Sequence, residues 1–130
     1  YRRLFISAKN TYQFYQGDLL AAFKKHHTAG HLELITTAAT HGFLPLLNIN
    51  EFSVQQQIDV GIAVFRLHFG FSPTGFWLPE CGYYPGLETR LAKSGINYFF
   101  IDSHGIIDAT KQAINNVYAP INRLFSSASL

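Results

Sequence analysis

The stretch "TGFWLPECGYYPGLETRLAKSGINYFFID", residues 74–102, decides the fold that we expect for this chain. It begins and ends with short apolar runs that predict strands over 74–79 and 97–102. The residues between them predict a helix over 85–94, which Gly95 ends. Two strands joined by a helix are typical of a parallel pair, because parallel neighbours need a crossover connection.

The upstream sequence repeats this alternation. Apolar residues at helical spacing predict a helix over 11–27 and another that is capped by Asn50, begins at Glu51 and ends at Gly70, and a strand-like run occupies 31–38 between them. The pattern predicts an α/β fold, with parallel strands and covering helices. A complete (β/α) barrel runs to about 250 residues, so we expect a sector of a larger barrel or of a doubly wound sheet.

Composition excludes several classes of protein. The 130 residues suit one small domain, and 48% hydrophobic against 14% charged residues argues against disorder. The net charge of +2, with scattered Lys and Arg, is too weak for nucleic-acid binding. Cys81 is the single cysteine, which excludes an internal disulfide, and no apolar run reaches the roughly 20 residues of a membrane span. We therefore expect no nucleic-acid or membrane partner and a cytoplasmic location.

The chain contains no methionine and opens on Tyr1. We therefore expect an internal or processed piece of a longer protein.

Three of the eight acidic residues, Glu33, Glu80 and Asp102, are predicted to lie within a strand or at its carboxyl end. Ligand sites of α/β proteins are assembled at that end of the sheet. Two of these carboxylates have equally good structural explanations. Glu33 is also explained as a strand carboxylate held by a neighbouring Arg, Lys or Tyr, and Asp102 as a turn or capping residue.

The surroundings of Glu80 favour a functional role. Pro79 removes a ladder hydrogen bond just before it, so we expect the chain to turn where this side chain projects. Trp77 and Tyr83 add aromatic rings, and rings around one carboxylate suit a sugar-binding cleft. The alternative is a strand-end turn with an ion pair.

Two histidines, His41 and His104, also follow predicted strand ends, each next to glycine. They are candidates for substrate contact, although loop histidines are often only polar surface residues. No histidine is accompanied by the partners of a defined metal site, so we expect no metal and no cofactor.

Segments 30–47, "GHLELITTAATHGFLPLL", and 75–88, "GFWLPECGYYPGLE", resemble two conserved regions of glycoside hydrolase family 57. Segment 96–106, "INYFFIDSHGI", continues the likeness, and 117–121, "VYAPI", extends it. Within that family the chain is most similar to the branching enzymes and related α-amylase-like members. The resemblance implies an incomplete (β/α)₇ barrel, which favours the barrel over the doubly wound sheet, and retaining chemistry on α-1,4-glucans such as glycogen or amylose.

The resemblance also implies roles for single residues. Glu80 matches the nucleophile of the Trp-Leu-Pro-Glu segment, and Glu33 and His41 match residues that line the site and hold sugar hydroxyls. Trp77 precedes the nucleophile, as in the family pattern. We add Tyr83, Asp102 and His104 as substrate-binding candidates from their positions, which completes the predicted site.

The chain departs from the family pattern in ways that limit its own chemistry. The family's N-terminal histidine segment and its later segment with the general-acid aspartate are absent. We therefore expect a partial catalytic barrel over 1–121, a divergent Ser-rich tail over 122–130, and no activity in the chain alone. Alternatives for the parent protein are an α-amylase, a 4-α-glucanotransferase, a non-catalytic carbohydrate-binding relative, or a metal-dependent polysaccharide deacetylase, against which the Trp-Leu-Pro-Glu segment argues.

Overall fold

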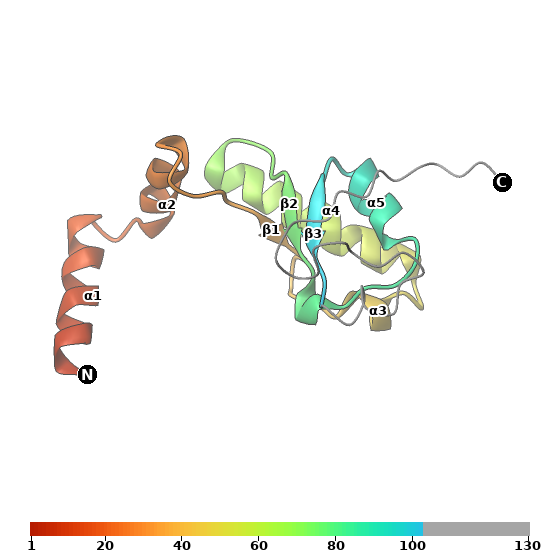
Figure 1. Ribbon diagram of the computed structural model, residues 1–130, viewed down its shortest axis with the longest axis horizontal. Coiled ribbons are helices and arrows are strands. Elements are labelled where there is room, and N and C mark those ends of the chain that lie inside the picture. The colour runs from red at the N-terminus through yellow and green to blue at the C-terminus, as the bar shows by residue number, and fades with distance from the viewer. Residues whose placement is uncertain (103–130) are drawn as a thin grey trace, which may run out of the picture.

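A computed structural model describes residues 1–102 and contains a three-stranded parallel sheet in the order β1–β2–β3 (Figure 1). In chain order the elements are α1 Arg2–Phe14, α2 Leu19–Thr28, β1 Thr36–Thr37, α3 Leu44–Leu47, α4 Glu51–Phe69, β2 Gly75–Trp77, the 3-10 helix η1 Pro79–Cys81, α5 Leu87–Lys93 and β3 Tyr98–Phe100. Helix α4 lies in the connection from β1 to β2, and α5 in that from β2 to β3. The predicted α/β class with parallel strands and helical crossovers is confirmed.

Helix α4 forms as the sequence predicts. The Asn50 side chain accepts hydrogen bonds from the backbone N–H groups of Phe52 and Ser53, at 3.0 and 3.4 Å. Gly70 ends the helix with a φ of 79°, a left-handed conformation that glycine adopts without steric cost. The buried residues of α4 are Val54, Ile58, Gly61, Ile62 and Phe65, at the spacing of one helical face.

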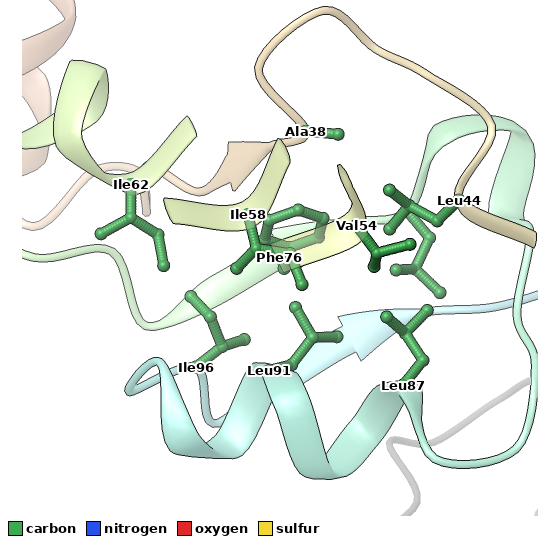
Figure 2. Packing of buried hydrophobic residues seen from close by; sticks show 10 residues of the cluster. Ala38, Leu44, Val54, Ile58, Ile62, Phe76, Leu87, Leu91 and Ile96 are labelled. Carbon is green, nitrogen blue, oxygen red and sulfur yellow. The ribbon is translucent and has the colours of Figure 1, made fainter. Parts of the chain in front are cut away.

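The core lies between the sheet and helices α4 and α5. Figure 2 shows side chains of α4, such as Ile58, and of α5, such as Leu91, around Phe76 of β2. Phe76 and Ile58 are fully buried and Leu91 nearly so. Burying each such side chain contributes roughly 1.5–3 kcal/mol, so this face of the sheet fixes both crossover helices.

Helix α4 approaches β1 unusually closely. A Cβ atom added at Gly61 would lie 2.2 Å from the backbone oxygen of Thr37. The Thr36 hydroxyl donates a buried hydrogen bond of 3.0 Å to the backbone oxygen of Gly61. Glycine at this position therefore lets the helix backbone lie directly on the strand that leads to the candidate site.

The other face of the sheet carries partly exposed aromatic side chains. Successive strand residues point to opposite faces, so Trp77 faces away from the buried Phe76. Trp77 and its β3 partner Phe100 are 42% and 46% exposed, and their ring centroids lie 5.6 Å apart. We call this the open face of the sheet.

The predicted helix over 11–27 is wrong in its extent, because the chain turns within it. Helix α1 ends at Phe14, Gly17 has a φ of 83°, and Asp18 caps a second helix by accepting a 2.8 Å hydrogen bond from the Ala21 N–H. The left-handed glycine and the capping aspartate together end one helix and begin the next. Helices α1 and α2 extend away from the sheet (Figure 1).

Two further elements differ from the prediction, one strand in its length and one helix that was not expected. The strand expected over 31–38 contains ladder pairing only at Thr36–Thr37. Helix α3, which has Pro45 in its first turn, was not predicted, and four residues are too short to show a helical period. Among the helices of residues 1–102, none is long and apolar enough to span a bilayer.

Candidate active site

Three predicted site residues follow the carboxyl ends of the three parallel strands. His41 comes four residues after β1, Glu80 three residues after β2, and Asp102 two residues after β3. Parallel strands end at a common edge of the sheet, where α/β enzymes assemble their sites. The sheet thus brings the three loops that carry these residues to one edge.

Glu80 is exposed and lies in a strained turn. Its φ and ψ are 52° and 28°, and the next residue, Cys81, has a φ of 54°. A left-handed conformation costs a non-glycine residue roughly 1–2 kcal/mol. The buried residues Leu78 and Pro79 anchor the turn. Their backbone oxygens accept hydrogen bonds from the N–H groups three residues later, those of Cys81 at 2.9 Å and Gly82 at 3.0 Å. Strain of this kind is concentrated at functional sites.

The loop that contains His41 packs against the turn that contains Glu80. A Cβ atom added at Gly82 would lie 2.3 Å from Cε2 of Phe43, so the Phe43 ring lies directly on the backbone of Gly82. Phe43 lies two residues after His41, and Gly82 lies two residues after Glu80. The contact therefore couples the positions of the two loops.

The His41 side chain is connected to both neighbouring strands through Thr37. The Thr37 hydroxyl donates a 2.8 Å hydrogen bond to the backbone oxygen of Trp77, which is its register partner across the sheet. The same hydroxyl lies 3.3 Å from Nδ1 of His41. His41 itself is exposed and has a φ of 54°. The imidazole is thus held at one nitrogen while its other edge is accessible.

Gln57 of α4 holds the segment that precedes His41. Its backbone oxygen accepts a 2.9 Å hydrogen bond from the Ala39 N–H, and its side-chain Oε1 accepts a 3.0 Å bond from the Thr40 N–H. Its Nε2 donates a 3.0 Å bond to the Thr40 hydroxyl. One helical residue therefore fixes two successive loop residues before His41.

The structure separates the two predicted aromatic residues of the site. Trp77 lies beside Phe100 on the open face of the sheet. Tyr83 stacks on Phe99, at 6.0 Å between ring centroids, and Phe99 packs against the core on the covered face. The Tyr83 hydroxyl donates a 2.9 Å hydrogen bond to Glu88. Only Trp77 thus faces the same side of the sheet as Phe100.

Glu33 lies before β1, at the amino ends of the strands, rather than within the strand that was predicted over 31–38. Its Oε1 accepts a 2.6 Å hydrogen bond from the Thr74 hydroxyl, and it also bonds Tyr98. Thr74 precedes β2 and Tyr98 begins β3. The ordered strand begins only at Thr36, which leaves Glu33 before the sheet rather than at its end.

These contacts change two ionisation equilibria. The hydrogen bonds from Thr74 and Tyr98 lower the pKa of Glu33 below its ordinary value. Desolvation, together with the hydrogen bond to Glu33 and its charge, raises the pKa of Tyr98 to about 12. A carboxylate bonded by a tyrosine is one of the structural explanations that the sequence left open for Glu33.

Some of the predicted residues lie at the end of the described part of the chain or outside it. Asp102 is exposed at the end of this region, whereas His104 and the boundary at residue 121 lie outside it. Within residues 1–102 no three His, Cys, Asp or Glu side chains are arranged to hold a metal ion. A largely apolar pocket lies between β1 and the second half of α4, and Trp77 is the one candidate residue that lines it.

Sequence reasoning missed Thr37 and Gln57, which position His41 without being chemically distinctive themselves. A signal for Gln57 was present, because it lies beside Val54 and Ile58 on the apolar face of a helix. A polar residue on such a face needs a hydrogen-bonding partner. Nothing in the sequence indicated that this partner would be the loop before His41.

Comparison with known proteins supports the family resemblance that the motifs indicated. The sequence profile of glycosyl hydrolase family 57 matches residues 4–129. A 1,4-alpha-glucan branching enzyme of Thermococcus kodakarensis is 38% identical over 120 residues, which cover 81% of this chain and 17% of the relative.

Solved structures agree with the fold. The alpha-amylase AmyC from Thermotoga maritima has a TM-score of 0.84 and 42% identity, over 92% of this chain and 23% of that one. A GH57-type branching enzyme from Pyrococcus horikoshii has a TM-score of 0.75 and 37% identity, over 80% and 22% of the two chains.

The chain thus spans less than a quarter of the length of these relatives. The predicted fold, a sector of an incomplete (β/α)₇ barrel with parallel strands and covering helices, is confirmed. The profile match covers nearly all of the sequence and includes every motif that carried the resemblance. This chain belongs to glycosyl hydrolase family 57.

Proposed function

We propose that the protein to which this chain belongs is a retaining enzyme of α-1,4-glucans, a 1,4-alpha-glucan branching enzyme, with Glu80 as its nucleophile. One observation carries the proposal: an exposed glutamate in a strained turn, at the carboxyl end of a parallel strand, in a chain of this family. The branching enzymes among its relatives support the choice of reaction.

In the proposed first step, a Glu80 carboxylate oxygen attacks the anomeric carbon of a bound glucan. A bond forms between that oxygen and the anomeric carbon, and the glycosidic bond breaks. A second carboxylic acid, supplied by the rest of the protein, protonates the leaving oxygen. In retaining sites the two carboxyl groups lie about 5–5.5 Å apart.

In the second step an acceptor hydroxyl attacks the glycosyl-enzyme and releases Glu80. The second carboxylate accepts the proton of that hydroxyl. A glucan 6-hydroxyl as acceptor gives a branch, and water gives hydrolysis. Both steps use only two carboxyl groups, and the strained turn presents one of them. The proposal therefore includes no cofactor.

The other candidate residues have binding roles in the proposal. His41 and Asp102 follow the same strand ends as Glu80 and would hold sugar hydroxyls, with His104 beyond them in sequence. Trp77 would stack on the apolar face of a sugar ring. Tyr83 and Glu33 stay predicted substrate contacts.

An α-amylase is the second candidate, favoured by the similarity to the Thermotoga maritima alpha-amylase. The two activities differ in the acceptor, since a branching enzyme transfers to a glucan hydroxyl and an amylase to water. The 4-α-glucanotransferase alternative differs in the same way. A cytoplasmic location stays part of the proposal.

The test uses the full-length protein with amylose, and measures α-1,6 linkages by NMR of the anomeric protons and new reducing ends by a reductometric assay. New α-1,6 linkages support branching, whereas reducing ends without such linkages support the amylase. Glucan binding without turnover would favour a non-catalytic relative and overturn both.

The variant Glu80→Gln is expected to lower turnover by on the order of 10³-fold or more, because an amide is a poor nucleophile. The matched control is Asp59→Asn, on the exposed face of α4, which also removes a carboxylate and keeps an oxygen to accept the Gln55 hydrogen bond. A mechanism-based cyclitol should label Glu80. Full activity of Glu80→Gln, or a label on Glu33 instead, would contradict the assignment.

A further inference from the structure

We propose that Thr37 fixes the tautomer of His41, so that the neutral imidazole carries its proton on Nδ1 and presents Nε2 as a hydrogen-bond acceptor. The tautomer rests on the contacts of the described residues. Its use in recognising a glucan hydroxyl rests in addition on the proposed function.

The argument begins with the backbone oxygen of Trp77, which can only accept hydrogen bonds. The Thr37 hydroxyl lies 2.8 Å from this oxygen and donates its proton to it. The two residues are register partners in the β1–β2 ladder, so the sheet itself maintains this distance. The single hydroxyl proton of Thr37 is therefore directed at Trp77.

It follows that the Thr37 oxygen can act only as an acceptor toward His41. The distance from this oxygen to Nδ1 of His41 is 3.3 Å. The hydrogen bond then requires a proton on Nδ1, because an unprotonated nitrogen facing an oxygen lone pair has nothing to donate. A neutral imidazole carries one N–H, so Nε2 is left with its lone pair free to accept.

Hydrogen bonds also hold the backbone segment that carries the His41 ring. The His41 N–H donates a 3.0 Å hydrogen bond to the backbone oxygen of Ala38. Gln57 holds the two residues between Ala38 and His41 from the helix side. Since His41 is exposed, the ring edge that bears Nε2 is accessible to a ligand.

The class of ligand follows from this chemistry. A neutral Nε2 acceptor selects a group that donates a hydrogen bond, such as a sugar hydroxyl, and gives no bond to an ether oxygen. Thr37 is thus a positioning residue, which acts on substrate only through His41. Within the proposed site, His41 would accept from a glucan hydroxyl near the scissile bond.

The test is spectroscopic and uses the full-length protein with ¹⁵N-labelled histidine at a pH near 8, where an ordinary imidazole is neutral. Long-range ¹H–¹⁵N correlation spectra distinguish Nδ1–H from Nε2–H rings, and the spectrum of His41→Gln assigns the signal. We expect the Nδ1–H tautomer in the wild type and in Thr37→Ser, which keeps the hydroxyl. We expect Thr37→Val to shift His41 mainly to the Nε2–H form, which predominates for imidazole side chains in water.

An Nε2–H ring in the wild type, or an unchanged Nδ1–H ring in Thr37→Val, would overturn the inference whatever the enzymatic activity. Kinetics on amylose provide the second readout. Thr37→Val should raise KM about tenfold with a smaller change in kcat, and Thr37→Ser should restore KM. Loss of the tautomer in Thr37→Val with no change in KM would refute the role in hydroxyl recognition. If the proposed function fails, the spectra still test the tautomer, because they do not depend on enzymatic activity.

Discussion

The Phe43 ring lies on the backbone of Gly82, and this contact joins the loop after β1 to the turn after β2. A methyl group at Gly82 would lie 2.3 Å from Cε2 of the ring, far inside van der Waals contact. The φ of Gly82 is −69°, so the glycine serves close approach rather than an unusual backbone conformation. The positions of His41 and Glu80 are therefore linked by packing.

The first prediction concerns this contact. Gly82→Ala should displace the Glu80 turn and lower kcat/KM about tenfold or more, because small misplacements of reacting groups are costly. The double variant Gly82→Ala/Phe43→Ala removes the clash and should recover part of the loss. Steady-state kinetics of the four proteins in this cycle measure the coupling. Strictly additive effects would show that the two residues act independently.

The second prediction concerns the helix residue that holds the His41 loop. Gln57→Leu leaves the Thr40 N–H without its acceptor, and should lower kcat/KM about tenfold, the equivalent of roughly 1–2 kcal/mol for such a bond. Gln57→Glu keeps the accepting oxygen and should retain most activity. The matched control is Gln55→Leu on the same helix, whose amide bonds Asp59 and Ser94 instead. Equal losses in Gln55→Leu and Gln57→Leu would contradict a specific role.

The third prediction is a pH dependence of stability at the opposite edge of the sheet. The folded pKa of Tyr98 is raised from 10.0 to about 12, so its contribution to stability is present below pH 10 and is lost as the pH rises toward 12. The lowered pKa of Glu33 has the opposite consequence. Its contribution is present above its ordinary pKa of 4.5 and is lost as the pH falls through the lower folded value.

Thermal unfolding of the wild type and of Tyr98→Phe across pH 8–12 tests the alkaline limb. The variant should show a smaller fall in Tm over this range, because it has no phenol to ionise beside Glu33. Tyr12→Phe, at an exposed position of α1, is the matched control and should follow the wild type. Parallel curves for all three proteins would disprove the prediction.

The fourth prediction concerns the core beneath the site. Leu91 is 1% exposed and packs in the cluster that joins α5 to the sheet, so Leu91→Ala should destabilise this domain by about 2–5 kcal/mol. Lys93→Ala, on the exposed side of the same helix, should change stability by no more than about 0.5 kcal/mol. Urea unfolding followed by tryptophan fluorescence measures both. Similar effects of the two substitutions would argue against the assigned core.

Much of the fold was predictable because it depends on local signals. The cap at Asn50, the left-handed Gly70 and the apolar face of α4 are all encoded within a few residues of one another. The division between α1 and α2 was missed although Gly17 and Asp18 encode it, since the apolar spacing continues across the turn. Periodicity alone does not reveal a short interruption.

The sequence by itself determined the alternation of strands and helices, the family motifs, and the placement of Glu80 and Asp102 after strands. Only the tertiary structure decided which of the candidates lie together. It placed Glu33 with Thr74 and Tyr98 at the far edge. It also placed Tyr83 on the covered face. The physical reason is that strand register and the packing of helices on the sheet set these contacts over separations of about 40 residues in the chain, and no local pattern records them.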